Sequence, residues 1–214
     1  MNGVHNEAGE SPVLQTENAS PAVDKEFRHG PTGTLTRLAG AAELAAVNEL
    51  HSRCSQDSLH KRYLGTRTGL TPGEWQHMTD GGTALTWVTY SPESPEHLIA
   101  VLQLVGSAGG DSADLGLLIE DPWQNRKLGT ALVRHARTQG HRIGATAITG
   151  TVDRQNTAML RILKGLGASL SFGGGSVIDA VLALPTIDDR LAPAQRERHP
   201  GSVGMASAGC LPLC

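Results

Sequence analysis

Three apolar runs in the middle of the chain limit the fold more than any other feature. Ala84–Tyr90, Leu98–Val105 and Ala113–Glu120 are rich in Val, Leu, Ile, Thr or aromatic residues, a composition typical of β-strands. Short polar stretches that contain Pro92 and the run Gly106–Gly110 separate them and predict loops. Because consecutive strands joined by short loops usually pair with each other, the sequence predicts an antiparallel meander.

Helical and strand patterns flank this meander on both sides. Before it, Thr34–Leu38 predicts a strand, Ala41–Cys54 predicts a helix, and Ser55 and Thr71 are placed to cap two further helices. After it we expect helices over Lys127–Thr138 and Asn156–Leu166 and strands over Ile143–Val152, Ser169–Phe172 and Val177–Leu184. The alternation predicts one α/β domain whose mixed, mostly antiparallel sheet is flanked by helices.

The two ends of the chain differ in composition from this domain. Residues 1–32 and 186–214 are rich in Pro, Gly, Ser and Ala and contain few large apolar side chains. Such segments bury too little surface to offset the entropy lost on ordering. We therefore expect a flexible N-terminal tail over 1–32, a domain over 33–185 and a flexible C-terminal tail over 186–214. Packing of the two ends as irregular loops is the alternative.

Charge and cysteine content exclude several classes of protein. The net charge is −3 and basic residues form no run, so neither a nucleic-acid nor a membrane partner is expected. Residues 1–10 have neither a basic nor an apolar stretch, so no secretory leader is expected. Three cysteines and scattered histidines show no metal-ligand spacing, which predicts no metal and a cytoplasmic setting. The oligomeric state stays open.

The segment Asp114–Ala131 reads as a strand, a short loop and the start of a helix. The loop Gln124–Gly129 lies where the first backbone N–H groups of the helix lack partners and where the helix dipole is positive. Arg126 and Lys127 add full positive charges, and the combination suits a phosphate or pyrophosphate. An ordinary surface turn with two solvated bases would have the same residues, so both interpretations stay open at this point.

Two segments carry a family resemblance. Trp123–Ala131 resembles the acetyl-CoA-binding motif of the GNAT acetyltransferases, (Q/R)-x-x-G-x-(G/A), and Asn156–Gly167 resembles the second motif of that family. Both lie on the predicted elements that the family requires, and the resemblance covers about residues 33–185. The run Cys54–Gly65 is also similar to bacterial protein-lysine acetyltransferases of this family.

The resemblance implies an N-acetyltransferase that moves an acetyl group from acetyl-CoA, its co-substrate, to a primary amine on a protein lysine or a small molecule. Direct attack of the amine on the thioester is implied, with a base to remove its proton. The positions that the resemblance assigns to acetyl-CoA are Leu117, Leu118 and Ile119 through their main chain, the loop residues Gln124, Asn125, Arg126, Lys127, Leu128, Gly129 and Thr130, and Asn156 through its amide.

Three positions depart from the family pattern. Lys127 occupies the place of the first motif glycine, so its side chain must point away from the pyrophosphate or reach over it. Leu163 occupies the place where many members have the tyrosine that protonates the leaving thiolate, and Ala168 replaces a common phenylalanine. The alternative function is therefore a non-catalytic CoA-binding sensor or interaction module on the same fold.

Asp114 is the candidate base. It shares one strand face with Gly116, Leu118 and Glu120 by the period of two, and related bacterial enzymes place a glutamate at its position. Aspartate is one methylene shorter and would act through a water molecule. A strand-start role for Asp114 is the alternative, and Glu120 is the rival base, although the following Asp121 and Pro122 indicate a solvated strand end.

Overall fold

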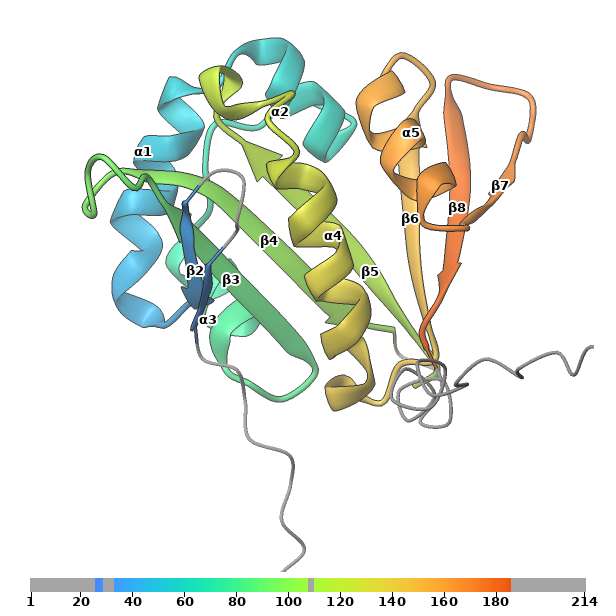
Figure 1. The fold of residues 1–214 in the computed structure, drawn as a ribbon, viewed down its shortest axis with the longest axis horizontal. Helices are drawn as coiled ribbons and strands as arrows, with labels where there is room; N and C mark the ends of the chain where they lie inside the picture. Colours follow the sequence, from blue (N-terminus) through green and yellow to red (C-terminus); the bar gives the residue numbers. More distant parts are fainter. Residues whose placement is uncertain (1–25, 29–32, 108–109, 186–214) are drawn as a thin grey trace, which may run out of the picture.

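The computed structural model describes residues 26–28, 33–107 and 110–185. These residues form an eight-stranded sheet in the order β1-β2-β3-β4-β5-β6-β8-β7 (Figure 1). The strands are β1 (Glu26–Arg28), β2 (Leu35–Leu38), β3 (Ala84–Tyr90), β4 (Leu98–Gly106), β5 (Ser112–Ile119), β6 (Ala147–Asp153), β7 (Ser169–Ser171) and β8 (Val177–Ala183). Only β5 and β6 pair in parallel within these residues, so the predicted mixed, mostly antiparallel sheet is confirmed.

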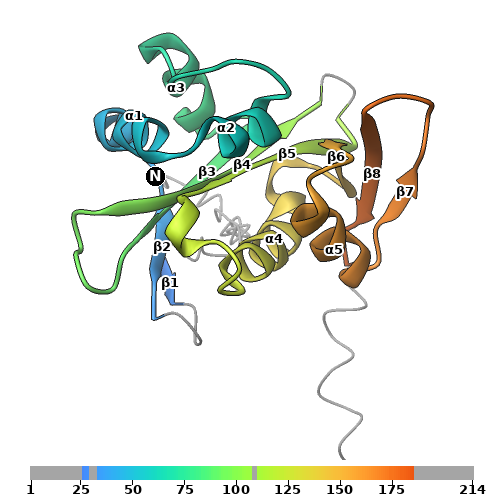
Figure 2. The ribbon, with the colours of Figure 1, turned by 90° about the horizontal axis from the view of Figure 1, so that it is seen from above.

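Five α-helices in the same described ranges cover the two faces of this sheet. They are α1 (Leu44–Arg53), α2 (Gln56–Tyr63), α3 (Pro72–Thr79), α4 (Leu128–Gln139) and α5 (Thr157–Gly165). Figure 2 shows α1, α2 and α3 on one face and α4 and α5 on the other. No helix in the described part of the chain has the length and apolar character that a membrane span needs.

The central strand β4 holds the two layers together because it is buried on both faces. Ile99 and Leu102 belong to the cluster under α4 and α5, whereas Leu98 and Val101 belong to the cluster under α1, α2 and α3. The sequence of a strand that is covered on both faces is a continuous apolar run instead of an alternation of apolar and polar residues. The meander β3-β4-β5 is antiparallel throughout, as predicted.

Two predicted helix caps are present. The Ser55 hydroxyl accepts a hydrogen bond from the Ser58 N–H at the start of α2. Thr71 and Glu74 form a capping box at the start of α3, with Pro72 in the first turn. Each cap satisfies N–H groups that have no partner inside the helix.

The strand predicted to begin at Ile143 begins instead at Ala147. Residues Gly140–Ile143 form a 3-10 turn, and Gly144 adopts a φ of +77°. Because this conformation lies outside the β region, an extended strand cannot start before Gly144.

A second correction concerns β1, since Glu26–Arg28 lies inside the range expected to be a flexible tail. It pairs antiparallel with β2. The Phe27 ring stacks on His135 of α4 with the ring centroids 3.7 Å apart, and this packing offsets the entropy of ordering so short a strand. Residues 1–25, 29–32 and 186–214 of the expected tails lie outside the described residues.

The Glu74 carboxylate gives the fold a defined response to acid. The N–H and hydroxyl of Thr71 and the guanidinium of Arg67 donate to it, and they lower the pKa of Glu74 from 4.5 to about 2. A lowered carboxyl pKa stabilises the folded state above pH 4.5, and this contribution is lost as the pH falls from 4.5 to about 2.

We therefore expect Glu74→Gln to be less stable than the unchanged chain at neutral pH, with a difference that shrinks as the pH falls through this window. Thermal unfolding followed by circular dichroism across the window measures it, with the exposed Glu96→Gln as the matched control. A difference that does not change with pH would contradict the expectation.

Candidate functional site

The strands β5 and β6 pair over only three positions and then separate. The pairs are Ser112 with Ala147, Ala113 with Ile148 and Asp114 with Thr149. Beyond them, in the described residues, β5 pairs only with β4 and β6 pairs only with β8. The facing edges of the two strands therefore offer main-chain N–H and C=O groups to the gap between them (Figures 1 and 2), and such groups need partners.

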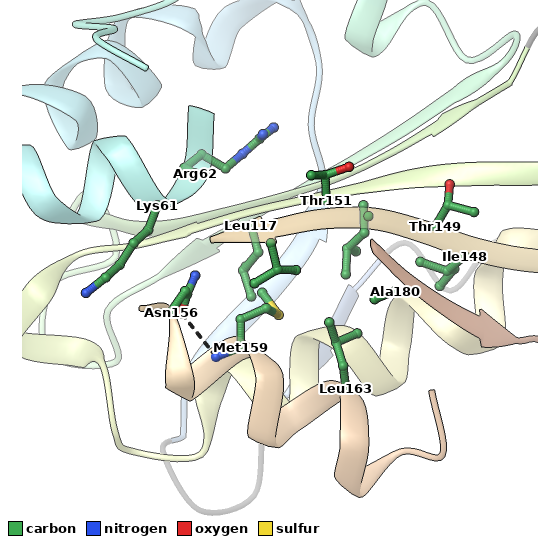
Figure 3. Close-up of a pocket in the computed structure, with 13 residues that line it drawn as sticks. Lys61, Arg62, Leu117, Ile148, Thr149, Thr151, Asn156, Met159, Leu163 and Ala180 are labelled. Atoms are coloured by element: carbon green, nitrogen blue, oxygen red, sulfur yellow. Dashed lines mark hydrogen bonds between the residues drawn. The ribbon is translucent and has the colours of Figure 1, made fainter. Parts of the chain in front are cut away.

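A groove of about 280 Å³ lies at this gap, between α2, the start of α4 and α5. Nine of the eleven positions expected to bind acetyl-CoA line it, namely Leu117, Leu118, Ile119, Gln124, Asn125, Lys127, Gly129, Thr130 and Asn156. A smaller cavity of about 50 Å³ shares Lys61, Arg62, Leu117, Asn156 and Met159 with the groove. Figure 3 shows that its walls come from both faces of the sheet, with Arg62 on one side and Met159 and Leu163 on the other.

The other two expected positions point elsewhere. Leu128 is buried in the core cluster under α4, so its side chain fixes the start of the helix. The Arg126 guanidinium lies over the Trp123 ring, 4.9 Å from its centroid, where a cation–π contact holds it. Neither side chain lines the groove, although the backbone N–H groups of both belong to the loop.

The loop that leads into α4 has a left-handed backbone at two positions. Asn125 has a φ of 58° and Lys127 a φ of 66°, a conformation that costs most residues about 1 kcal/mol or more. Lys127 stands where the resemblance expects glycine, and it adopts the conformation for which glycine is preferred. Its side chain lines the groove, so the substitution keeps the turn and adds a positive charge.

Gln124 and Asp121 tie this loop to α2. The Gln124 amide donates to the Ile119 carbonyl at 3.0 Å and to the Ser58 hydroxyl at 2.9 Å. The Asp121 carboxylate accepts from the hydroxyls of Ser55 and Ser58 at 2.7 and 2.9 Å. Burial acts to raise the pKa of Asp121, but a hydrogen bond from the Ser55 N–H and those from the two hydroxyls hold it below its usual range. The network fixes α2 against the end of β5.

Gly129 allows the first turn of α4 to lie close to β5 and α5. A Cβ atom at this position would lie 3.1 Å from Ile162 Cδ1 and 3.4 Å from Ile119 Cδ1. The close approach brings the unpaired N–H groups at the start of α4 to the mouth of the groove, where they favour an anion.

Asn156 has a structural role in addition to its place in the groove wall. Its side-chain oxygen accepts a hydrogen bond from the Met159 N–H at 3.1 Å and caps α5 (Figure 3). The amide NH₂ group is therefore the part of the side chain that is left for a ligand.

Three basic residues of the groove wall were not predicted as site residues. They are Lys61 and Arg62 of α2 and Arg161 of α5. Lys61 and Arg62 lie inside the run Cys54–Gly65, whose family resemblance was the signal that could have found them. Arg161 lies inside the run Asn156–Gly167, whose resemblance to the second motif was the corresponding signal.

Comparisons with known proteins agree with this geometry. No family model matches the chain, and no curated protein matches it. Among solved structures, the GNAT domain of S. lividans PAT superposes with a TM-score of 0.67 at 17% identity, covering 76% of this chain and 99% of that one. The chain has the GNAT fold.

Two further GNAT-fold structures are similar. A putative acetyltransferase from Salmonella typhimurium, solved with acetyl-CoA, has a TM-score of 0.57 at 16% identity and covers 71% of this chain and 94% of its own. Spermidine N-acetyltransferase from Vibrio cholerae, solved with CoA and spermine, has a TM-score of 0.55 at 14% identity. The match covers 71% of this chain and 95% of the Vibrio cholerae chain. At these identities the similarity establishes the fold.

Within this GNAT fold, Asp114 lies near the gap but not in the groove wall. It is exposed, and the Thr149 hydroxyl donates to its Oδ1 at 2.6 Å. It precedes Gly116 by two residues on the same strand face, about 7 Å along β5. The base role of Asp114 stays a prediction.

The expectation of a solvated strand end at Glu120 is wrong. The Glu120 side chain is buried, and its two oxygens contact Arg53 Nε at 2.9 Å and His97 Nε2 at 2.6 Å. Because both oxygens have partners, Glu120 holds β5 against α1 and is a poor base. Leu163 is buried in the apolar wall of the smaller cavity and has no proton to supply.

The cap at Asn156 can be separated from ligand binding by substitution. Asn156→Ala removes the cap of α5, which should lower the free energy of unfolding by about 1 kcal/mol. Asn156→Asp keeps an oxygen for the Met159 N–H and should lose much less. Urea unfolding measures both, and equal losses for the two variants would argue against the cap.

Proposed function

We propose that this chain is an N-acetyltransferase that binds acetyl-CoA in the gap between β5 and β6 and transfers the acetyl group to a primary amine. The observation that carries the proposal is the separation of β5 from β6 beside the start of α4. The Salmonella typhimurium and Vibrio cholerae proteins of the same fold were solved with acetyl-CoA and with CoA, which supports the same ligand here.

The residues present fit the parts of this ligand. The backbone N–H groups from Asn125 to Thr130 would bind the pyrophosphate, with Lys127 and Arg161 supplying positive charge. The open edge of β5 at Leu117–Ile119 would pair with the amides of the pantetheine arm. Met159 and Leu163 form an apolar wall that suits its methylene groups.

The transfer step follows from thioester chemistry. The amine nitrogen attacks the carbonyl carbon, a C–N bond forms and the C–S bond breaks. The amine loses a proton to a base, and the CoA thiolate takes up a proton. We propose Asp114 as the base, acting through a water molecule because its carboxylate lies outside the groove wall. With Leu163 in the tyrosine position, the thiolate takes up its proton from water.

The acceptor class is a protein lysine or a small amine, and the proposed setting is the cytoplasm. One observation favours the second candidate, a non-catalytic CoA-binding sensor on this fold. Leu163 provides no acid inside the cavity, and Asp114 lies beyond its wall. Binding of acetyl-CoA is common to both candidates, whereas turnover belongs only to the first.

Calorimetric titration with acetyl-CoA tests the site. We expect binding by the unchanged chain and its loss in Gly129→Glu, because a Cβ atom at Gly129 would lie 3.1 Å from Ile162 Cδ1 and the added carboxylate would repel the pyrophosphate. Gly165→Glu is the matched control, since a Cβ atom at Gly165 meets no neighbouring atom within 4 Å. The site assignment is wrong if neither the parent nor the control binds.

Substitution of Asp114 tests the base. Asp114→Asn keeps an acceptor for the Thr149 hydroxyl but removes the basic carboxylate. We expect turnover to fall by about a hundredfold or more while acetyl-CoA binding is unchanged. The exposed Asp111→Asn is the matched control. Unchanged turnover in Asp114→Asn would remove Asp114 from the mechanism and leave the enzyme assignment standing.

A further inference from the structure

The Arg62 guanidinium lies over Gly116 of β5, close to the point where β5 and β6 separate. It lies so close over Gly116 that a Cβ atom at residue 116 would collide with Arg62 Cζ and Nη2. Gly116 comes two residues after the last β5–β6 pair. Arg62 belongs to α2, on the face of the sheet opposite α4 and α5 (Figure 3), and it lines both the groove and the smaller cavity.

The positive charge of Arg62 has no acidic partner in the described part of the chain. Its Nη2 donates to the neutral side-chain oxygen of Gln103 at 2.5 Å, and its guanidinium lies 4.8 Å from the centroid of the Tyr63 ring. The neighbouring basic residues differ, because Lys61 pairs with Asp57 and Arg67 pairs with Glu74. Burial lowers the pKa of Arg62, and the nearby Arg67 lowers it further.

A largely desolvated charge without a counter-charge destabilises a folded protein. A guanidinium also has five N–H donors in a planar fork that matches a carboxylate, and Gln103 accepts from one of them. Arg62 is also one of the residues that line the two cavities. The site thus has the charge and the geometry to bind an anionic group of a substrate.

We propose that Arg62 binds the carboxylate of the acceptor, and that the acceptor is an α-amino acid whose amine is acetylated. This inference rests on the proposed function. The anionic phosphates of the acyl donor would lie at the start of α4, on the other face of the sheet, and its thioester end is uncharged. An anion at Arg62 therefore belongs to the second substrate. Asp114, on the Arg62 side of β5, is then placed to serve the neighbouring amine.

Acceptor pairs that differ only in the carboxylate test the inference. Release of CoA thiol is measured with the common L-α-amino acids and with their α-carboxamides. For the unchanged chain we expect kcat/KM to favour the best acid over its amide by about tenfold or more. Arg62→Gln should abolish this preference through a rise in KM of about tenfold to a hundredfold, and Arg62→Lys should restore part of it. The exposed Arg134→Gln, on α4, is the matched control.

Thermal unfolding of the same variants separates a ligand-binding role from a structural one. Removal of a charge without a counter-charge should leave the Tm of Arg62→Gln equal to or above that of the unchanged chain. A lower Tm with an unchanged acid-to-amide ratio would show that Arg62 serves the fold and would overturn the inference. An equal fall in kcat for acids and amides would assign Arg62 to the reacting carbonyl instead and would also overturn it.

Failure of the inference can be distinguished from failure of the proposed function. Turnover with amides, or with lysine peptides, but not with amino acids would keep the acetyltransferase and exclude the carboxylate site. If no amine is acetylated, the readout becomes binding instead of kcat/KM. The same acids and amides are then titrated by calorimetry in the presence of CoA. Binding of an acid that Arg62→Gln loses supports the carboxylate site, and the absence of such binding overturns it.

Discussion

The short pairing between β5 and β6 is the constraint on which the rest of this structure depends. Three residue pairs join these strands, whereas seven join β5 to β4 and seven join β6 to β8. The stronger pairing on the outer sides keeps the two strands apart once they have separated. The fold thereby maintains a sheet with open edges in its interior, which isolated strands could not do because unpaired backbone groups favour closure.

Each face of the sheet supplies a different kind of group to this gap. The α4 and α5 face supplies backbone N–H groups, an apolar wall and the basic side chains of Lys127 and Arg161. The α2 face supplies Arg62, whose charge is left without a carboxylate among the described residues although its neighbours Lys61 and Arg67 have one. The hydrogen bonds of Asp121 and Gln124 join α2 to the loop before α4 at the end of β5. The groups on both faces of the sheet are therefore held in place by the same hydrogen-bond network.

Local signals account for what the sequence predicted well. The strand Ala84–Tyr90 and the capping box of Thr71 with Glu74 are defined by residues within a few positions of each other. The strand at Glu26–Arg28 was missed because Phe27 is ordered by His135, far along the chain. The Arg62–Gly116 contact was missed for the same reason, since it depends on how α2 crosses β5. Glu120 was misjudged because Arg53 and His97 reach it from other elements.

The strand β1 also has a practical consequence for work with this domain. A shortened chain that begins at residue 33 would keep every element around the groove but would lose Phe27 and the partner of β2. The backbone of Leu35–Leu38 would then present a free sheet edge beside the uncovered ring of His135. Such edges pair readily with other copies of the same chain, so self-association would follow from removal of a segment that the sequence predicts to be a flexible tail.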